Sequence, residues 1–213
     1  MRSLNVSKTK EELKEFYNSL AEKAGPDWQY TYMMSAKHQR ERIQKTLEIL
    51  RRRVLPTHSI LDLGCANGEL TCVFGLHANK GSVVGVDISD IALNSAPSRY
   101  NVSYVESDIT DFLKSCTEDQ FDIVVATEVL EHIPNYAEVI RLMRKVGRYI
   151  LVSVPVNEEP NEDAFNINKF GKETKMGDAT GHIHHFDRDT LEFHFNEILD
   201  EWTNGIHLIL GGN

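Results

Sequence analysis

Short apolar runs alternate with amphipathic segments along most of the chain. The apolar runs are rich in Val and Ile, and they predict strands over residues 59–63, 82–86, 102–105, 121–126 and 148–154. The segments between them predict helices over residues 67–78, 89–96, 109–115 and 135–146. Strands that alternate with helices form a parallel sheet with helices on both faces. The pattern therefore predicts an α/β fold with a doubly wound, mostly parallel sheet.

Two amphipathic helices are predicted before the first strand, over residues 9–24 and 36–54. Gly25 and Pro26 end the first of them. The second ends in the basic run Arg51–Arg53. We interpret this run as cations that complement the helix dipole, in preference to a nucleic-acid patch.

The alternation stops over residues 156–186, which are rich in Pro, Gly, Asn, Asp and Glu. A loop of this length in a compact domain is usually functional or disordered. Asp187 is then a suitable N-cap for a last helix over residues 188–200. A single strand over residues 205–210 is expected to end the fold.

The composition is that of a globular protein, and it limits the classes of partner. Of the 213 residues, 41% are hydrophobic, and 23 Lys and Arg against 32 Asp and Glu give a net charge of -9. An acidic surface repels phosphate backbones, which argues against a dedicated nucleic-acid-binding protein. Cys65, Cys72 and Cys116 contain no Cys-x-x-Cys pair. This argues against a disulfide framework or a zinc site and favours the cytoplasm. No apolar run approaches the length of a membrane span.

A glycine turn follows the first predicted strand. Gly64 and Gly68 permit positive φ and a close approach of the backbone to a ligand, and Asp62 stands just before them. A dinucleotide site would instead have Gly-x-Gly-x-x-Gly beside a pyrophosphate. An acid would repel a pyrophosphate, whereas it favours a cationic sulfonium and an amino group.

Two further acids stand at the ends of the next two strands. Asp87 can accept hydrogen bonds from both hydroxyls of a ribose, and Asp108 can accept one from an adenine amine. Each acid alone is also a suitable N-cap or turn residue. Because parallel strands end at one edge of the sheet, we expect Asp62, Asp87 and Asp108 to face one crevice.

Residues 59–154 resemble the class I S-adenosylmethionine-dependent methyltransferases. The matching segments are Ile60-Leu-Asp-Leu-Gly-Cys-Ala-Asn-Gly68, Val84-Gly-Val-Asp-Ile88, Glu106-Ser-Asp-Ile109 and Phe121-Asp-Ile-Val-Val-Ala-Thr-Glu-Val-Leu-Glu-His132. The resemblance implies a Rossmann-like fold with S-adenosylmethionine as the cofactor. By the resemblance, the turn Gly64–Gly68, which includes Cys65 and Ala66, would lie under the methionine part of the cofactor. Asp87 and Ile88 would contact the ribose, and Asp108 and Ile109 would contact the adenine. Glu128, beyond the fourth strand, would be a further cofactor contact.

The resemblance also implies an arrangement for the rest of the chain. The N-terminal helices would form a lid in which Tyr17 contacts the cofactor, although plain helix packing also explains this residue. The chain would then be one methyltransferase domain. Its parts are a lid (1–55), a cofactor-binding core (56–155), a loop on the substrate side (156–186) and a final helix and strand (187–213). The family commonly has glycine at the position of Ala66, and it usually closes with two antiparallel strands where we expect one.

Glu128, Glu131 and His132 follow the fourth strand, and they project near one another if a helical turn begins there. His132 is the candidate general base for methyl transfer to a hydroxyl, because its ordinary pKa lies near working pH. A structural role, as a cap or in packing, is the alternative for this residue.

A second histidine cluster, at His182, His184 and His185, ends the long loop. We take His185 as the second catalytic candidate. Similar Glu-x-x-Glu-His elements help to bind a divalent ion in ubiquinone-pathway O-methyltransferases and in small-RNA 3′-end ribose methyltransferases. The resemblance thus leaves a divalent metal open as a second cofactor, and we assign no metal ligands.

The sequence favours an enzyme that moves a methyl group to a hydroxyl or amine of a small molecule. An RNA 3′-end ribose 2′-O-methyltransferase is the second hypothesis, disfavoured by the acidic balance. A non-catalytic methyltransferase-like partner subunit is the third, disfavoured by the intact strand-end acids. A nicotinamide dehydrogenase is disfavoured by the order of the glycines.

Overall fold

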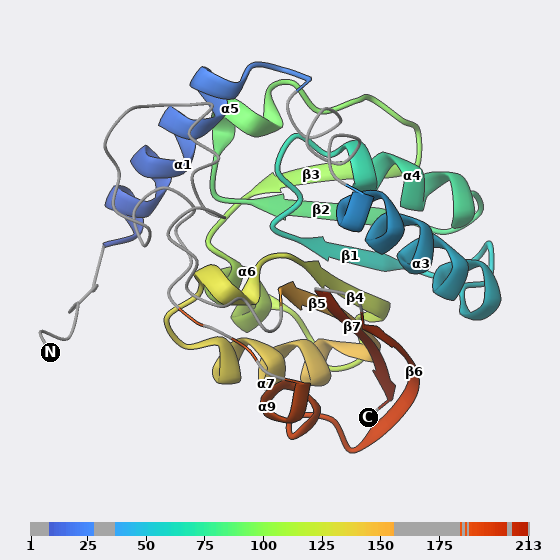
Figure 1. Cartoon of the computed structure of the whole chain (residues 1–213). Helices are drawn as coiled ribbons and strands as arrows, with labels where there is room; N and C mark the ends of the chain where they lie inside the picture. The colour runs from blue at the N-terminus through green and yellow to red at the C-terminus, as the bar shows by residue number, and fades with distance from the viewer. Residues whose placement is uncertain are drawn as a thin grey trace, which may run out of the picture.

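A computed structural model describes residues 9–27, 37–155, 184, 186, 188–203 and 206–212. One seven-stranded sheet lies at its centre, in the order β3-β2-β1-β4-β5-β7-β6 (Figure 1). The strands are β1 (Ile60–Leu63), β2 (Val83–Asp87), β3 (Val102–Glu106), β4 (Phe121–Thr127), β5 (Gly147–Pro155), β6 (Glu197–Thr203) and β7 (Ile206–Gly212). The first five are parallel, and β7 runs antiparallel to both β5 and β6.

Helices cover both faces of the sheet, as the alternating pattern predicts. They are α1 (Lys10–Ala24), α3 (Lys37–Arg53), α4 (Glu69–His77), α5 (Asp90–Leu93), α6 (Ile109–Ser115), the 3-10 helix η1 (Leu130–His132), α7 (Tyr136–Val146) and α9 (Arg188–Glu192). Apolar residues of α3 and α4 pack with Ile60 on one face, and those of α6 and α7 pack with Leu61 on the other. Neighbouring residues of a strand point to opposite faces, so both must be apolar here.

The C-terminal region differs from the expectation of one long helix and one strand. Helix α9 ends at Glu192, and residues 197–203 form β6, which pairs with β7. A register shift between Ile198 and Asp200 interrupts the alternation of β6, and both Leu199 and Trp202 pack against the core. Apolar residues three apart on one face imitate a helix. The prediction of a single closing strand was therefore wrong, and the sheet closes with the two antiparallel strands usual in the family.

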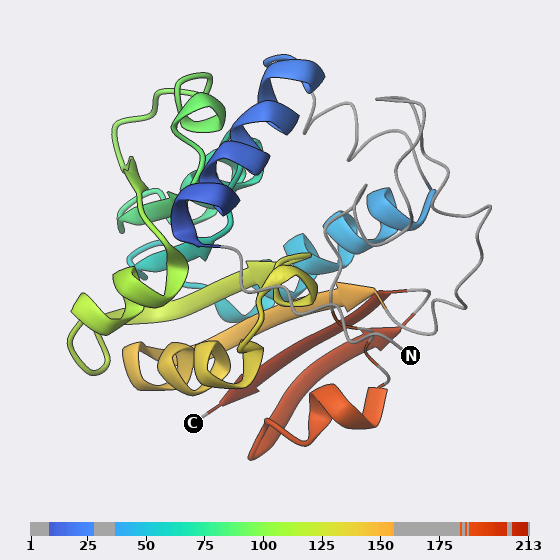
Figure 2. The same ribbon diagram turned by 90° about the vertical axis from the view of Figure 1, so that its left-hand side faces the viewer.

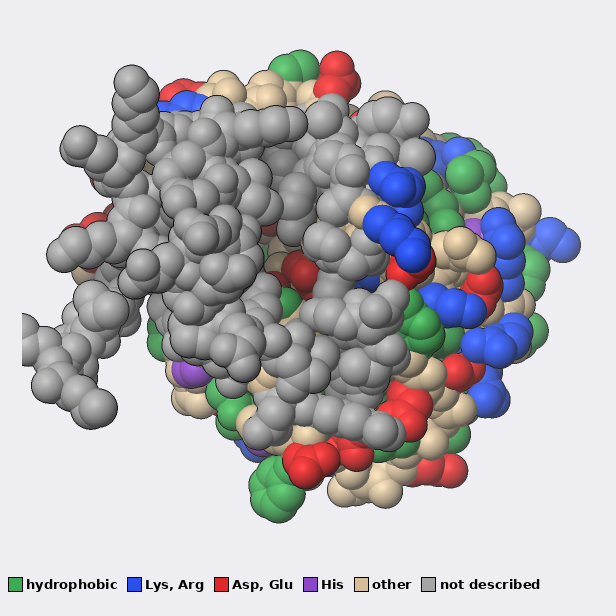
Figure 3. Space-filling model, viewed as in Figure 1, with side chains coloured by type: hydrophobic (Ala, Val, Ile, Leu, Met, Phe, Trp, Pro, Cys, Tyr) green, Lys and Arg blue, Asp and Glu red, His purple; other side chains and the backbone are tan. Residues whose placement is uncertain are grey.

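The basic C-terminal end of α3 contacts β6, the outermost strand at one end of the sheet. The Arg52 guanidinium forms an ion pair with Asp200 at 2.7 Å, and Arg53 donates to the carbonyl of Leu199 at 3.1 Å. Lys and Arg side chains lie on the side of the molecule that carries α3 (Figure 3). Two of the three arginines thus bind α3 to β6 in addition to any effect on the helix dipole. Within the described ranges, no helix is long and apolar enough to cross a membrane.

Helix α1 lies apart from both layers, beside α5 and near the carboxyl ends of β2 and β3 (Figures 1 and 2). A capping box starts it, in which Thr9 accepts from the amide of Glu12 and the Glu12 side chain accepts from the amide of Thr9. Gly25 ends it with a φ of 80°. Its position places α1 beside the edge of the sheet at which parallel α/β proteins bind ligands.

Candidate cofactor site

The turn after β1 has the left-handed backbone that its glycines predict. Gly64 and Gly68 have φ values of 66° and 73°, and Ala66 adopts 50°. A Cβ on Gly64 would lie 2.5 Å from a methyl carbon of Val129, so a side chain has no room there. The amides of Gly64 and Cys65 both donate to the carbonyl of Val86, at 2.8 and 3.1 Å. These contacts hold the turn against the end of β2.

Asp87 joins this turn to the segment after β2. One carboxylate oxygen accepts from the amide of Ala66 and the other from the amide of Ser89, each at 2.8 Å. Burial raises the pKa of Asp87, and its backbone hydrogen bonds act to lower it. The two oxygens offer about four lone-pair positions, and the backbone amides of Ala66, Ile88 and Ser89 leave room for a ligand hydroxyl to donate to the carboxylate.

Asp62 lies in the interior, with 3% of its surface exposed. Its carboxylate accepts from the hydroxyl of Thr71 on α4 at 2.6 Å. Burial raises the pKa of Asp62 to about 7, although the Thr71 hydrogen bond and the charge of Arg42 act to lower it. Asp62 therefore lies under the glycine turn, between β1 and α4, and is covered from solvent.

Asp108 is the N-cap of α6, and its carboxylate accepts from the amide of Asp111 at 3.0 Å. Ile109 is the first residue of that helix and packs against the core. Lys10 of α1 lies 3.7 Å from the Asp108 carboxylate. The turn interpretation thus holds for Asp108 in this structure, while the side chain keeps lone pairs for a ligand.

Tyr17 projects from α1 toward the ends of β2 and β4. Its ring packs edge-on against His132, with centroids 6.3 Å apart. Burial raises the pKa of the Tyr17 phenol, and the charges of Asp87 and Glu131 raise it further. Beside it, the Ser89 hydroxyl donates to Asn18 at 2.6 Å. The N-terminal aromatic residues Trp28, Tyr30 and Tyr32 lie outside the described residues.

Two lysines tie α1 to the segments after β2 and β3. Lys14 forms ion pairs with Asp90, at 3.1 Å, and with Glu106. Lys10 forms an ion pair with Asp111 in addition to its contact with Asp108. At the other end of α1, the side chain of Asn67 donates to the carbonyl of Pro26 at 2.6 Å. Helix α1 and its C-terminal extension therefore contact all three strand-end segments.

In the segment after β4, Glu128, Glu131 and His132 do not share one helical face, contrary to our expectation. Glu128 has a φ of 57°, and its carboxylate accepts from the hydroxyl of Ser153 at 3.0 Å. Glu131 is fully buried in η1, and its Oε1 lies 3.8 Å from Nε2 of His132. Glu131 and His132 are thus neighbours in space, whereas the Glu128 carboxylate is directed to β5.

His184 anchors the end of the long loop to this segment. Its amide donates to the carbonyl of Glu131 at 3.2 Å, and its Nε2 lies 2.9 Å from the carbonyl of Ile133. Its ring packs edge-on against Tyr136. His182 and His185 lie outside the described residues. The part of the chain that the structure describes contains no group of three side chains able to hold a metal ion.

Sequence reasoning missed Arg42, a buried residue of α3 with 4% of its surface exposed. Its Nε donates to Gln39 at 2.9 Å, and its charge acts on Asp62. A signal was present, because Gln39, Arg42 and Thr46 follow the helical spacing of the apolar residues on the same face of α3. Polar residues on the buried face of a helix indicate a polar partner inside.

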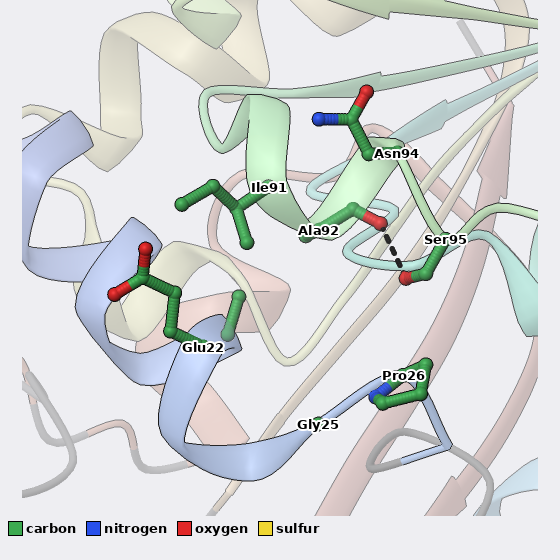
Figure 4. A pocket seen from close by; sticks show the side chains of 8 residues that line it. Glu22, Gly25, Pro26, Ile91, Ala92, Asn94 and Ser95 are labelled. Atoms are coloured by element: carbon green, nitrogen blue, oxygen red, sulfur yellow. Dashed lines mark hydrogen bonds between the residues drawn. The ribbon is translucent and has the colours of Figure 1, made fainter.

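A cavity of about 270 Å³ lies between α1 and α5, lined by Ala21, Pro26, Ile91 and Ser95 among others (Figure 4). Ser95 donates to the carbonyl of Ala92 at 2.8 Å within it. The lining of the cavity comes from the end of α1 and from α5, in the segment that follows β2. It therefore adjoins the strand-end site without including the glycine turn.

Comparisons with known proteins agree with this geometry. A family model described as a methyltransferase domain matches residues 56–201. A ubiquinone biosynthesis O-methyltransferase of Hahella chejuensis is 33% identical over 124 residues, which are 54% of this chain and 50% of that protein. A ribosomal protein L11 methyltransferase of Neisseria gonorrhoeae is 35% identical over 105 residues, 49% of this chain and 35% of that protein. The chain spans half or less of the length of these curated relatives.

Solved structures share the fold at low sequence identity. A magnesium protoporphyrin IX methyltransferase of Synechocystis, solved with bound S-adenosylhomocysteine, has a TM-score of 0.69 at 14% identity. That likeness covers 96% of this chain and 100% of the other. A methyltransferase of Archaeoglobus fulgidus has a TM-score of 0.62 at 19% identity, over 88% and 100% of the two chains. The family model shows that the chain belongs to the methyltransferase domain family, and the sheet order and the solved structures show that it has the Rossmann-like fold of these methyltransferases.

Proposed function

We propose that this methyltransferase acts on a hydroxyl or amine of a small molecule and that His132 accepts the proton released there. The observation that carries the proposal is the place of His132, between the Tyr17 ring and the buried Glu131 carboxylate. Only 20% of the His132 side chain is exposed. A narrow acceptor group reaches such an imidazole more easily than a bulky polymer does.

Buried polar atoms support the assignment of the cofactor to the glycine turn. Within the described ranges, Nη1 of Arg42 and Oδ1 of Asn67 are buried without a hydrogen-bond partner. Nearly all such groups in proteins are paired, often with a ligand or water. A methionine carboxylate would be an acceptor for Arg42, and a methionine ammonium would be a donor for Asn67 and a counter-charge for Asp62. The residues present therefore fit S-adenosylmethionine.

The other cofactor contacts follow from the strand ends. Asp87, with the backbone at Ile88, would hold the ribose hydroxyls, and Asp108, with the backbone at Ile109, would hold the adenine amine. Tyr17 would close the site from α1. When bound, S-adenosylmethionine supplies an activated methyl group on a sulfonium. The protein positions the acceptor in line with that methyl group and removes its proton.

Glu131 supports His132 in this role. Oε1 of Glu131 lies 3.8 Å from Nε2 of His132, and Glu131 is fully buried. A carboxylate at this distance stabilises the positive charge that the imidazole gains when it takes a proton. His184 holds the same segment through the carbonyls of Glu131 and Ile133. His185, our second catalytic candidate, follows His184 directly in the sequence.

The names of the relatives span two acceptor classes, a quinone precursor and a ribosomal protein. The test is therefore a transfer assay with labelled S-adenosylmethionine on three separated fractions of a cell extract: small molecules, RNA and protein. We expect label in the small-molecule fraction, and we expect His132→Asn to abolish it while S-adenosylhomocysteine still binds. Label confined to RNA or protein would contradict the proposal.

Two further arms separate the remaining hypotheses. Transfer that is lost in EDTA and restored by a divalent ion would establish a metal-dependent reaction. A chain that binds S-adenosylhomocysteine but labels none of the three fractions would indicate a non-catalytic partner subunit.

A further inference from the structure

Tyr104 of β3 fills a slot that two glycines leave open beneath the cofactor turn. A Cβ on Gly68 would lie 2.5 Å from Cε1 of Tyr104 and 2.7 Å from its hydroxyl oxygen. A Cβ on Gly85 of β2 would lie 2.9 Å from Cδ1 of the same ring. The ring is thus packed against the last residue of the turn and, beside Cys65 and Thr71, against the neighbouring strand, so neither glycine has room for a side chain.

The hydroxyl of Tyr104 is also directed at the turn. It lies 3.3 Å from the carbonyl of Gly68 and 3.1 Å from the carbonyl of Pro97, and it can donate its one hydrogen to either. The Gly68 carbonyl also accepts from the amide of Cys72 at 2.9 Å, in the first turn of α4. Burial raises the pKa of the Tyr104 phenol, so the hydroxyl stays a donor at every physiological pH.

The turn needs such support because its conformation is unusual. Gly68 is the N-cap of α4 in a left-handed conformation, and it has no side chain with which to cap the helix. Glycine reaches many other conformations at little cost. When a binding-competent conformation is only partly populated, affinity falls in proportion to that population.

We propose that Tyr104 is a positioning residue that holds the Gly64–Gly68 turn in the shape that binds the amino-acid end of the cofactor. The inference rests on the proposed cofactor site, in which that turn lies under the methionine part. Tyr104 contacts Gly68 of the turn through its ring and its hydroxyl, so it does not need to touch the cofactor itself.

The test compares two ligands by calorimetric titration, S-adenosylhomocysteine and methylthioadenosine, which lacks the amino-acid end. We expect Tyr104→Phe to weaken the binding of S-adenosylhomocysteine by about 3- to 10-fold, the effect of one lost hydrogen bond. The affinity for methylthioadenosine should change by less than about 2-fold, because the proposed contacts of its ribose and adenine come from the segments after β2 and β3. Tyr104→Leu, which also empties the slot, should show a larger loss of the same kind.

Tyr100→Phe is the matched control, since the Tyr100 hydroxyl donates to the carbonyl of Asn79 and its side chain is 80% exposed. It should bind both ligands as the wild type does. Equal weakening of both ligands in Tyr104→Phe, or no weakening of either, would overturn the inference while leaving the cofactor site intact. A wild-type chain that binds neither ligand would overturn the proposed function, and the inference with it.

Discussion

At the scale of single residues, Asp87 has two tasks that different substitutions separate. Asp87→Ala removes the acceptor for the amides of Ala66 and Ser89, which should cost about 1–3 kcal/mol of unfolding free energy. Asp87→Asn keeps the size and one acceptor oxygen but removes the charge. We expect it to weaken S-adenosylhomocysteine at least about 10-fold with a smaller loss of stability.

Titration calorimetry and thermal unfolding measure these two effects. Asp122→Asn is the matched control, because the Asp122 carboxylate accepts from the amide and hydroxyl of Ser59 at the opposite edge of the sheet. Unchanged ligand affinity in Asp87→Asn would show that the ribose does not bind here.

Asp62 makes a prediction about pH. Burial raises the pKa of Asp62 to about 7, above the ordinary value of 3.8. The unfolded chain therefore loses this proton at lower pH than the folded chain does. The contribution of Asp62 to stability is present at acidic pH and is lost as pH rises from about 4 to about 7.

Asp62→Asn removes this titration. As pH rises from about 4 to about 7, the unfolding free energy of the wild type should therefore fall relative to that of Asp62→Asn, by up to about 4 kcal/mol. Denaturant unfolding at several pH values measures the difference. Asp122→Asn should shift in the opposite sense and at pH values below the ordinary pKa of 3.8, because burial raises the pKa of Asp122 but the hydrogen bonds from Ser59 and the charges of His58 and Arg148 together lower it. A gap between Asp62→Asn and wild type that does not change with pH would contradict the buried position of the carboxylate.

At the scale of elements, α1 is held to the site by charge. Lys10 and Lys14 pair with acids after β2 and β3, and exposed pairs of this kind are screened by salt. If α1 closes the cofactor site, the double variant Lys10→Glu/Lys14→Glu should weaken S-adenosylhomocysteine about 3- to 10-fold at low salt. The gap from wild type should shrink at about 1 M salt.

Amide hydrogen exchange measures directly how firmly α1 is held, and we expect the amides of α1 to exchange faster in the double variant than in the wild type. The matched control is Lys37→Glu/Lys114→Glu, which breaks exposed pairs with Glu41 and Glu138 away from the site. Equal affinities in the two double variants would show that α1 does not close over the cofactor.

The elements also show what sequence patterns can and cannot predict. The five parallel strands are predictable because both of their faces are buried, which leaves continuous apolar runs. Strand β6 is not, because the register shift places Leu199 and Trp202 at helical spacing. The strand-end acids are recognisable in the sequence, and so is an N-cap role for Asp108, but the contact that Asp62 makes inward with Thr71 is not. Helical spacing does place Arg42 on the buried face of α3, but its effect on Asp62 and the contacts of Tyr104 join residues far apart in sequence, which periodicity does not reveal.

At the scale of the whole molecule, the proposed cofactor site lies at the carboxyl ends of the parallel strands and combines segments far apart in the chain. Arg42 comes from α3, the turn follows β1, and Asp87 and Asp108 follow β2 and β3. Helix α1, together with Pro26 just beyond its C-terminus, contacts each of these three strand-end segments. The central claim is that this edge binds S-adenosylmethionine and not a dinucleotide.

Calorimetric titration with S-adenosylhomocysteine, with NADH as the control ligand, tests that claim most directly. We expect saturable one-to-one binding of S-adenosylhomocysteine that Asp87→Asn weakens, and no heat of binding from NADH. Binding of NADH, or no binding of S-adenosylhomocysteine by a folded chain, would contradict it.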